Sequence, residues 1–279
     1  MRSAGFAVVI GHNVERDARE EMFRASRTFF LDRSPSDKQR FNFGAYGAPT
    51  GGFTAQGVEA VARTFDSADS PADLVESYVL TLASFRNSAE HAPELIAAGR
   101  KYVDQVSALM HKLHHLSARA LGVADDFFDR FYDENASLAL RLAHYPAINP
   151  SDVAPGQQRY GSHVDYEGFT ILAVEEPGDT GLEVWLNGAW NKVSCPADGL
   201  IVNVGELITY WSGGRWKATL HRVVNSHPER PRFSLPFFSG PNLKAEVVPI
   251  GSPPGTRGIL AGEHLQRQLD RSNTKPAKL

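Results

Sequence analysis

The stretch "YGSHVDYEGFTIL", Tyr160–Leu172, places a histidine and a carboxylate two residues apart, His163 and Asp165, directly before an apolar run. Side chains at positions i and i+2 of a β-strand point to the same face, so an imidazole nitrogen and a carboxylate oxygen there could converge on one ion. A His-x-Asp pair by itself is a weak signal, because most such pairs are ordinary surface residues. Its meaning depends on what the rest of the chain supplies.

The surrounding sequence has the pattern of short strands and turns that is typical of an antiparallel β-fold. From residue 136 onward, short β-rich runs recur at regular spacing, separated by turn signals such as Asn187-Gly188 and Gly213-Gly214. About eight strands at this spacing predict a jelly roll or barrel. The runs are "LALRLAHY", "FTILAVEE", "LEVWLNG", "WNKVS", "GLIVNVG", "LITYWSGG", "TLHRVVN" and "RFSLPFF".

The N-terminal half has a helical pattern instead. After a short β-branched run at residues 5–10, helix-compatible patterns cover residues 15–32, 70–85 and 92–123, the last ending at Gly122, with a short helix expected at 125–133. Within residues 70–85, Tyr78 and Val79 could instead belong to a strand. We therefore expect a mainly β protein with α-helices in one folded unit. Its expected regions are an N-terminal helical or mixed part that packs on the core (1–135), a β core (136–245), and a C-terminal helix with a frayed tail (246–279).

Composition excludes several classes of protein. The 279 residues carry a net charge of -3 with no basic stripe, so nucleic acid is not expected as a partner. One cysteine, Cys195, excludes an intrachain disulfide and fits a reducing compartment. No apolar run has the roughly 18 residues that a membrane helix needs. We expect a cytoplasmic monomer or weak homodimer that binds no membrane.

A third candidate ligand, His221, lies in "ATLHRVVN" on a predicted strand. Two histidines and one carboxylate form the facial arrangement of non-heme Fe(II) oxygenases, which leaves coordination positions open. In "RFSLPFF", Arg232 and Ser234 again share one strand face, and a guanidinium beside a hydroxyl can clamp a carboxylate. Tyr145 in "LAHYP" could add a phenolic donor to the same anion.

These residues together resemble the plant-type 2-oxoglutarate- and Fe(II)-dependent dioxygenases, the superfamily that includes isopenicillin N synthase. The resemblance covers most of the chain. Five stretches match the catalytic core of the family in order and spacing: "HVDYEGFTIL", "GLEVWLNGAWNKV", "LIVNVGELITYWSGGRWKATLHRV", "RFSLPFF" and "GPN". Before the core, the early strand of the family resembles "GFAVVIGHNV", and the segments after that strand resemble "GGFTAQGVEA" and "DLVESY". The closing helix of the family resembles "GEHLQRQLDRS".

The resemblance implies a double-stranded β-helix, or jelly-roll, core. It implies iron ligands at His163, Asp165 and His221, and it assigns Arg232 and Ser234, assisted by Tyr145, to the distal carboxylate of 2-oxoglutarate. The implied cosubstrates are 2-oxoglutarate and O2 with Fe(II), and ascorbate is an expected assay additive. The implied activity is oxidation of a small metabolite of secondary metabolism, most simply hydroxylation but also desaturation or ring closure, with release of succinate and CO2.

Some positions depart from the family pattern. An Ile-Pro-x-Ile-Asp-like run that often opens family members is missing, so we expect a chain that is short or mis-started at its N-terminus. Ala143 stands where many members have asparagine, which weakens one cosubstrate contact, and Glu206 stands where aspartate is common. Asp165 is intact, which disfavours a halogenase, because relatives that transfer chloride have a small residue there.

Other candidate residues carry weaker signals. Segments that cover the pocket mouth in relatives, and the end of the clamp strand, suggest five substrate contacts: Phe53, Arg63, Tyr78, Phe237 and Phe238. The run "HKLHH" places His111, His114 and His115 on one helix face. They could bind metal, but we expect a solvated helix face because no carboxylate accompanies them.

Two other functions stay open from the residues alone. One is an iron oxidase that does not use 2-oxoglutarate, like isopenicillin N synthase, because an Arg-x-Ser clamp can also hold a substrate carboxylate. The other is a non-catalytic jelly-roll binding or sensor protein. The intact set of His163, Asp165 and His221 argues against the second, since a binding module need not keep an open metal site.

Overall fold

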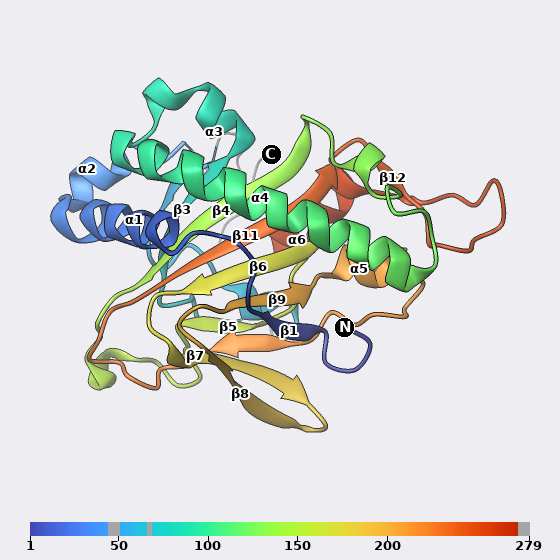
Figure 1. Ribbon diagram of the computed structural model, residues 1–279. Helices are drawn as coiled ribbons and strands as arrows, with labels where there is room; N and C mark the ends of the chain where they lie inside the picture. The colour runs from blue at the N-terminus through green and yellow to red at the C-terminus, as the bar shows by residue number, and fades with distance from the viewer. Residues whose placement is uncertain (44–50, 66–68, 273–279) are drawn as a thin grey trace.

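Antiparallel β-sheets form the centre of the protein in the computed structural model, which describes residues 1–43, 51–65 and 69–272 (Figure 1). The larger sheet contains β1 (Phe6–Val9), β9 (Leu200–Val204), β6 (Phe169–Val174), β11 (Arg232–Asn242), β4 (Ala136–Tyr145), β3 (Glu76–Thr81) and β2 (Gly52–Thr54), in that order. The smaller sheet contains β5 (Tyr160–His163), β10 (His221–Val223), β7 (Gly178–Leu186) and β8 (Ala189–Cys195). A short pair joins β12 (Glu246–Val247) to β13 (Ile259–Leu260). The expectation of a mainly β fold with helices is confirmed.

The strands of the larger sheet come from both halves of the chain. β1, β2 and β3 belong to the first 135 residues, yet β1 pairs with β9 and β3 pairs with β4 of the expected core. The N-terminal region therefore extends the sheet as well as packing helices on it. The glycine-rich segment at residues 41–57, which reads as a loop by its glycine content, contains the strand β2, while residues 44–50 lie outside the described residues.

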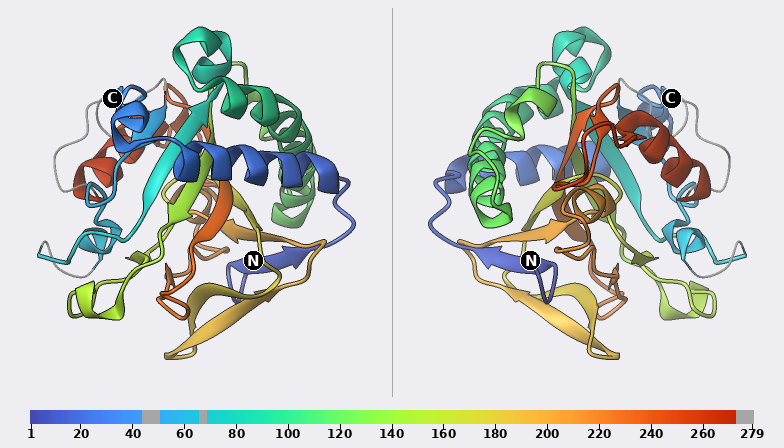
Figure 2. Two further views of the ribbon diagram at one scale, coloured as in Figure 1. Left: turned by 90° about the vertical axis from the view of Figure 1, so that its left-hand side faces the viewer. Right: turned by 90° about the vertical axis from the view of Figure 1, so that its right-hand side faces the viewer.

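The two helices α1 (Arg16–Arg27) and α4 (Pro93–Leu121) cover one face of the larger sheet (Figure 2). The other α-helices are α2 (Pro35–Gln39), α3 (Leu82–Arg86), α5 (Glu206–Trp211) and α6 (Ala261–Ser272). A π-helical turn, η1 (Thr28–Asp32), continues α1, and short 3-10 turns occur at η2 (Val61–Thr64), η3 (Ser88–Glu90), η4 (Asp129–Phe131) and η5 (Pro150–Asp152). α1 packs beside α4, while the β7–β8 hairpin projects at the end opposite to α3 (Figures 1 and 2).

Several local sequence signals act as expected. Gly122 ends α4 with a φ of 76°, a left-handed conformation that glycine adopts without steric cost. Asn187 and Gly188 have φ values of 54° and 79° and close the β7–β8 hairpin, as two-residue turns of this kind require. The Ser34 side chain accepts a hydrogen bond from the Asp37 N–H and caps α2. Local backbone chemistry thus determines these turns and helix ends.

The run "LITYWSGG" is predicted from its sequence to be a strand leading into a hairpin, and this prediction is wrong. It contains most of the helix α5, which buries Leu207, Ile208 and Trp211 on one side, and Gly213-Gly214 forms the turn after that helix. The free N–H groups of its first turn find acceptors in a neighbouring loop: Glu206 N donates to Asp165 O at 2.8 Å and Leu207 N to Glu167 O at 3.0 Å. Tertiary partners therefore favour the helix.

The helix expected to start near Ser70 is also partly wrong. The chain at residues 76–81 is the strand β3, paired with β4 on one side and β2 on the other, and the helix α3 starts only at Leu82. Thr81 and Ser84 form a reciprocal capping box at its start. Side chains on both faces of this strand are buried, so its sequence lacks the alternation that identifies a half-exposed strand.

None of the helices in residues 1–43, 51–65 and 69–272 is both long enough and apolar enough to cross a membrane. The longest, α4, buries one side, including Leu95, Tyr102, Val106 and Met110, and exposes charged residues on the other. This pattern is that of a helix packed on a protein core.

A cluster of aromatic rings joins the α1–η1 helix to the sheet. Phe29 is fully buried and lies edge-on to Tyr78 at 4.9 Å and to Phe30 at 5.1 Å between ring centroids. Phe53 lies in the same cluster. Such pairs contribute beyond the burial of apolar area. The cluster fixes the first helix against β2 and β3.

We predict that Phe29→Ala lowers the free energy of unfolding by about 3–5 kcal/mol, because it leaves a cavity in this cluster. Chemical denaturation followed by circular dichroism measures the change. Leu31→Ala is the matched control: its side chain is two residues away but 50% exposed, so its midpoint should move far less. Equal losses for the two variants would contradict the assignment of the cluster.

Candidate metal centre

Three potential ligands meet where the two sheets approach each other. His163 ends β5 and is the direct cross-strand partner of His221, which begins β10, while Asp165 follows in the loop after β5. The Nε2 atoms of His163 and His221 each lie 3.6 Å from Oδ1 of Asp165, and all three side chains are buried. The strand pairing therefore brings together residues 58 positions apart (221 minus 163), as the spacing of the motifs predicts.

Backbone carbonyls fix the orientation of both imidazole rings. Nδ1 of His163 lies 2.9 Å from Gly161 O, and Nδ1 of His221 lies 3.0 Å from Thr219 O. A carbonyl oxygen can only accept, so the proton of each neutral ring resides on Nδ1. This leaves the Nε2 lone pairs of both rings directed toward Asp165, which is the arrangement a metal ligand requires.

The Asp165 carboxylate is held at one oxygen and available at the other. Its Oδ2 accepts hydrogen bonds from Thr170 Oγ1 and Asn203 Nδ2, both at 2.5 Å, whereas Oδ1 faces the two imidazoles. Burial by itself raises the pKa of Asp165, but its interactions with His221 and His163 and the hydrogen bond from Thr170 outweigh burial and hold this pKa below the usual range. Burial, and then His163, lower the pKa of His221 to about 4.

This donor set fits a divalent first-row metal ion. The two Nε2–Oδ1 separations of 3.6 Å are shorter than twice the metal–ligand distance of about 2.1 Å, so one ion can lie between these donors. The ionised carboxylate and unprotonated Nε2 atoms are the forms that bind metal. The remaining positions of an octahedral ion would be open to small ligands.

The three predicted clamp residues also come together. Arg232 on β11 pairs with Tyr145 on β4, and its guanidinium carbon lies 4.7 Å from the centroid of the tyrosine ring. Arg232 Nη1 donates to Ser234 Oγ at 3.2 Å, and Nε donates to Thr180 O of β7 at 2.8 Å. Arg232 thus reaches from the larger sheet to the smaller one.

A second buried guanidinium, that of Arg159, lies near this clamp and had no signal in the sequence. Its Nη2 donates to the carbonyl oxygens of His227 and Arg230. Burial, and then the charge of Arg232, lower the pKa of Arg159. Within residues 1–43, 51–65 and 69–272, neither Arg159 nor Arg232 forms an ion pair with a carboxylate. Two uncompensated positive charges of this kind favour an anionic ligand.

A cavity of about 280 Å³ adjoins the candidate metal ligands. His163, Asp165 and Tyr160 form part of its wall, while apolar residues dominate the rest. The apolar side chains in the wall are Val79, Leu82, Ala83, Ala136, Leu138, Ala139, Phe169, Phe238, Leu243, Leu265 and Leu269. Polar side chains also line it, among them Arg86, Asn135, Tyr166 and Glu167, a carboxyl whose pKa burial raises to about 8.

The five expected substrate contacts fall in different places. Phe238 lines the cavity, whereas Phe237, its neighbour on β11, points to the opposite face and is buried in the core. Phe53 and Tyr78 belong to the aromatic cluster, and the Tyr78 hydroxyl lies 2.8 Å from His91 Nδ1. Arg63 donates to Ser70 O. Of the five, the cavity wall includes Phe238 alone, and the substrate role of each stays a prediction.

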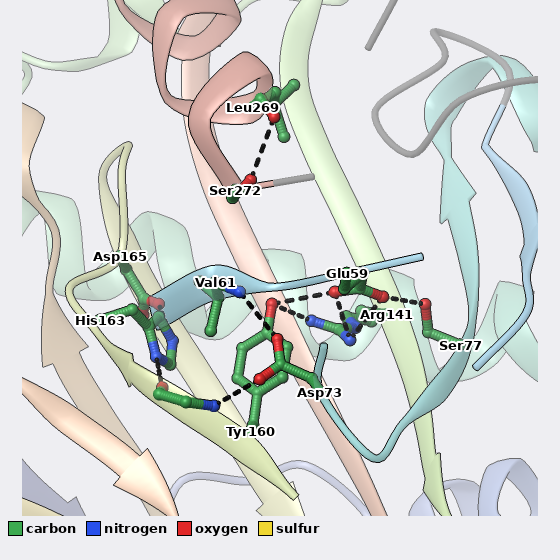
Figure 3. A network of polar contacts seen from close by, with 11 residues as sticks. Glu59, Val61, Asp73, Ser77, Arg141, Tyr160, His163, Asp165, Leu269 and Ser272 are labelled. Carbon is green, nitrogen blue, oxygen red and sulfur yellow. Dashed lines mark hydrogen bonds and ion pairs between the residues drawn. The ribbon is translucent and has the colours of Figure 1, made fainter. Parts of the chain in front are cut away.

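A buried polar network holds Tyr160, the residue whose ring packs against the candidate ligand His163 (Figure 3). The ring of Tyr160 packs edge-on against His163 with centroids 4.8 Å apart. Its hydroxyl accepts from Arg141 Nη1 at 2.7 Å and donates to Glu59 Oε2 at 3.0 Å, and Arg141 also pairs with Glu59 at 2.8 Å. A carboxylate and a guanidinium 82 residues apart thereby fix the tyrosine that packs on His163.

Asp73 holds the backbone on the same side. Its two oxygens accept hydrogen bonds from the N–H groups of Val61 and Gly161, both at 2.8 Å (Figure 3). Burial raises the pKa of Asp73 to about 6. Gly161 cannot carry a side chain here, because a Cβ would lie 2.7 Å from that of Ala62. This contact positions the strand from which His163 projects.

A buried site of two histidines and one carboxylate, built on antiparallel sheets beside arginines without a carboxylate partner in the described residues, defines the class of non-heme iron oxygenases. Comparison with known proteins identifies the family. A model of the 2OG-Fe(II) oxygenase superfamily matches residues 136–241. The chain is 31% identical over 256 residues to gibberellin 20 oxidase 1 of Oryza sativa subsp. japonica, covering 88% of this chain and 66% of that protein.

Further relatives agree. A 2-oxoglutarate-dependent dioxygenase of Penicillium crustosum is 30% identical over 258 residues, which cover 87% of this chain and 76% of the relative. The crystal structure of a full-length Neurospora crassa protein in complex with alpha-KG superimposes with a TM-score of 0.80 at 27% identity, over 96% of this chain and 87% of that one. The chain belongs to the 2OG-Fe(II) oxygenase superfamily, whose enzymes use Fe(II), 2-oxoglutarate and O2.

We predict that Arg141→Met lowers the free energy of unfolding by about 3–5 kcal/mol, because it leaves the Glu59 charge buried without its partner. Thermal and chemical denaturation measure this loss. Arg119→Met is the matched control, since Arg119 pairs with Asp125 on the exposed surface and its loss should leave the midpoint nearly unchanged. A midpoint unchanged by Arg141→Met would show that this pair contributes nothing.

Proposed function

We propose that this chain oxidises a small-molecule metabolite with Fe(II), 2-oxoglutarate and O2, within a double-stranded β-helix core at residues 136–245. In this proposal His163, Asp165 and His221 hold the iron. The observation that carries it is the convergence of two Nε2 lone pairs and one carboxylate oxygen at the wall of an apolar cavity. The family match at residues 136–241 lies within the proposed core.

The proposal assigns Arg232 and Ser234, assisted by Tyr145, to the distal carboxylate of 2-oxoglutarate. The uncompensated charge of Arg232 supports this role, as does the hydroxyl that it already contacts. A guanidinium binds a carboxylate through two parallel N–H groups, so an anion there would gain direction as well as charge. Arg159 adds positive potential behind Arg232 while its own N–H groups bind backbone carbonyls.

Iron bound at this site would supply the activation of O2 that couples decarboxylation of 2-oxoglutarate to oxidation of the substrate. The protein's own part is positioning. Thr170 and Asn203 hold one oxygen of Asp165, so that the other keeps its direction. The carbonyls of Gly161 and Thr219 hold the imidazoles. The apolar wall excludes water from the reacting centre.

The cavity indicates the character of the substrate. Its mainly apolar wall favours a compact molecule with a hydrocarbon or aromatic skeleton, and Glu167 with Ser137 offers a polar contact near the metal-binding residues. Among the relatives, the rice protein is named for gibberellin, and a structure of the Neurospora protein contains thymine. We propose hydroxylation as the main reaction, with desaturation or ring closure as outcomes that depend on the substrate.

Two alternatives are less well supported. An oxidase that does not use 2-oxoglutarate would also keep the iron ligands, and Ala143, opposite Ser234 in the sheet, is the departure that suggests it. The relatives named above include a 2-oxoglutarate-dependent dioxygenase and a protein in complex with alpha-KG, which favours 2-oxoglutarate use. A non-catalytic binding protein would not need a complete donor set.

We predict that Asp165→Ala abolishes succinate formation and iron binding, because it removes the only anionic donor of the proposed ligand set. The assay is anaerobic titration with Fe(II) and 2-oxoglutarate, followed by the visible absorption band that the complex is expected to give. Asn191→Ala, on the exposed β7–β8 hairpin, serves as the control. Succinate formation that survives Asp165→Ala would overturn the ligand assignment.

We predict that Arg232→Met weakens 2-oxoglutarate binding by about 10–100-fold while iron binding persists, because charged hydrogen bonds to the carboxylate are lost. Isothermal titration of the iron-loaded protein measures this affinity. Arg230→Met, which removes an exposed charge two residues away, should change it little. Equal affinity in Arg232→Met and wild type would contradict the proposed clamp.

A further inference from the structure

A second group of metal-binding side chains lies on the outer surface of α4. His111 and His115 are one helical turn apart, and Asp129 of η4 approaches both of them. His115 Nε2 lies 3.0 Å and 3.1 Å from the two oxygens of Asp129, and His111 Nδ1 lies 3.6 Å from Oδ1. The centroids of the two imidazole rings are 4.2 Å apart.

This arrangement corrects two expectations from the sequence. A carboxylate does accompany the "HKLHH" run, because the turn after Gly122 returns the chain along α4 and brings Asp129 to the histidines. His114 does not share their face: it is buried against the ring of Tyr132, with centroids 4.0 Å apart, and burial lowers its pKa to about 3. The surface face therefore carries two histidines and one aspartate.

The distances match those around a tetrahedral ion. Zinc binds imidazole nitrogen and carboxylate oxygen at about 2.0–2.1 Å, so neighbouring ligand atoms around it lie about 3.3–3.4 Å apart. The separations of 3.0 Å and 3.6 Å from Asp129 differ from that value by only a few tenths of an ångström. Histidines at i and i+4 lie on the same face of a helix, so α4 holds both rings near one point.

The group is accessible and separate from the buried centre. The side chains of His111, His115 and Asp129 are 60%, 32% and 39% exposed, whereas those of His163, Asp165 and His221 are buried between the sheets. A hydrated ion can therefore reach the surface group directly. Water can also fill the remaining coordination positions of an ion bound there. At the buried site, the corresponding positions would instead take the small-molecule ligands.

We propose that His111, His115 and Asp129 form a second metal site, which takes a borderline divalent ion such as Zn²⁺ with water completing its coordination. Two imidazoles and one carboxylate suit such an ion. The ion would replace the hydrogen bond between His115 and Asp129 and link α4 to η4. Because β4 begins soon after η4 and its first residues line the cavity, metal at this site would stiffen the approach to the cavity wall.

Zinc titration by calorimetry tests the proposal, with Zn²⁺ alone as the probe. The His163→Ala/His221→Ala double variant removes the buried site, and it should still bind one equivalent of Zn²⁺. Adding His115→Ala to that variant should weaken the remaining binding by more than about tenfold, because a direct ligand is lost. Asp129→Asn should weaken it in the same direction.

The controls separate this site from the buried one and from loose surface binding. His227→Ala removes an exposed histidine that lies 3.7 Å from Glu229, and it should leave zinc affinity unchanged. Circular dichroism of each variant confirms that the fold is retained. Absence of zinc binding by the double variant, or equal weakening by His227→Ala and His115→Ala, would overturn the proposal. Zinc protection of the double variant against thermal unfolding, lost when His115→Ala is added to it, would support the proposal.

Discussion

The carboxylate of Asp165 connects the two sheets, and the geometry of the candidate centre depends on it. One of its oxygens is held by Thr170 of β6 and Asn203 of β9, both in the larger sheet, while the other faces the histidines of β5 and β10 in the smaller sheet. Its backbone carbonyl also accepts the Glu206 N–H at the start of α5. A charge buried between two sheets is costly in free energy unless neighbouring groups stabilise it. The contacts of Asp165 therefore fix the relative positions of β6, β9, the loop after β5 and the start of α5.

The arginines on the two sides of this centre differ in whether a carboxylate neutralises their charge. Beneath His163, Arg141 is neutralised by Glu59 and by the hydroxyl of Tyr160, so its charge is satisfied within the protein and the network acts as a rigid support. At the clamp, the partners of Arg159 and Arg232 in the described part of the chain are backbone and hydroxyl oxygens, so their charges remain available to an incoming anion. The same type of side chain is thus neutralised within the protein in one place and left without a carboxylate partner among the described residues in the other.

Arg232 and Ser234 could be predicted as a pair because both lie on β11, where residues two apart share a face. The same two-residue spacing suggested the pair His163 and Asp165, but β5 ends at His163, so the loop after the strand and not strand alternation brings Asp165 to the histidines. Arg159 could not be found in this way, because only the fold places it beside Arg232. Glu59 and Arg141 are 82 residues apart, and no local pattern connects them. The helix α5 was missed because its short apolar run fits either structure, and acceptors in the Asp165 loop favour the helix.

The two imidazole rings of the centre are oriented by main-chain atoms, the carbonyls of Gly161 and Thr219, each two residues before the histidine that it holds. Main-chain atoms persist whatever side chain a mutation introduces. Substitutions in the walls of the neighbouring cavity, which are built from side chains, therefore leave these two hydrogen bonds and the orientation of both rings in place. A lineage can therefore exchange the side chains of those walls while the orientation of the two imidazole rings stays unchanged.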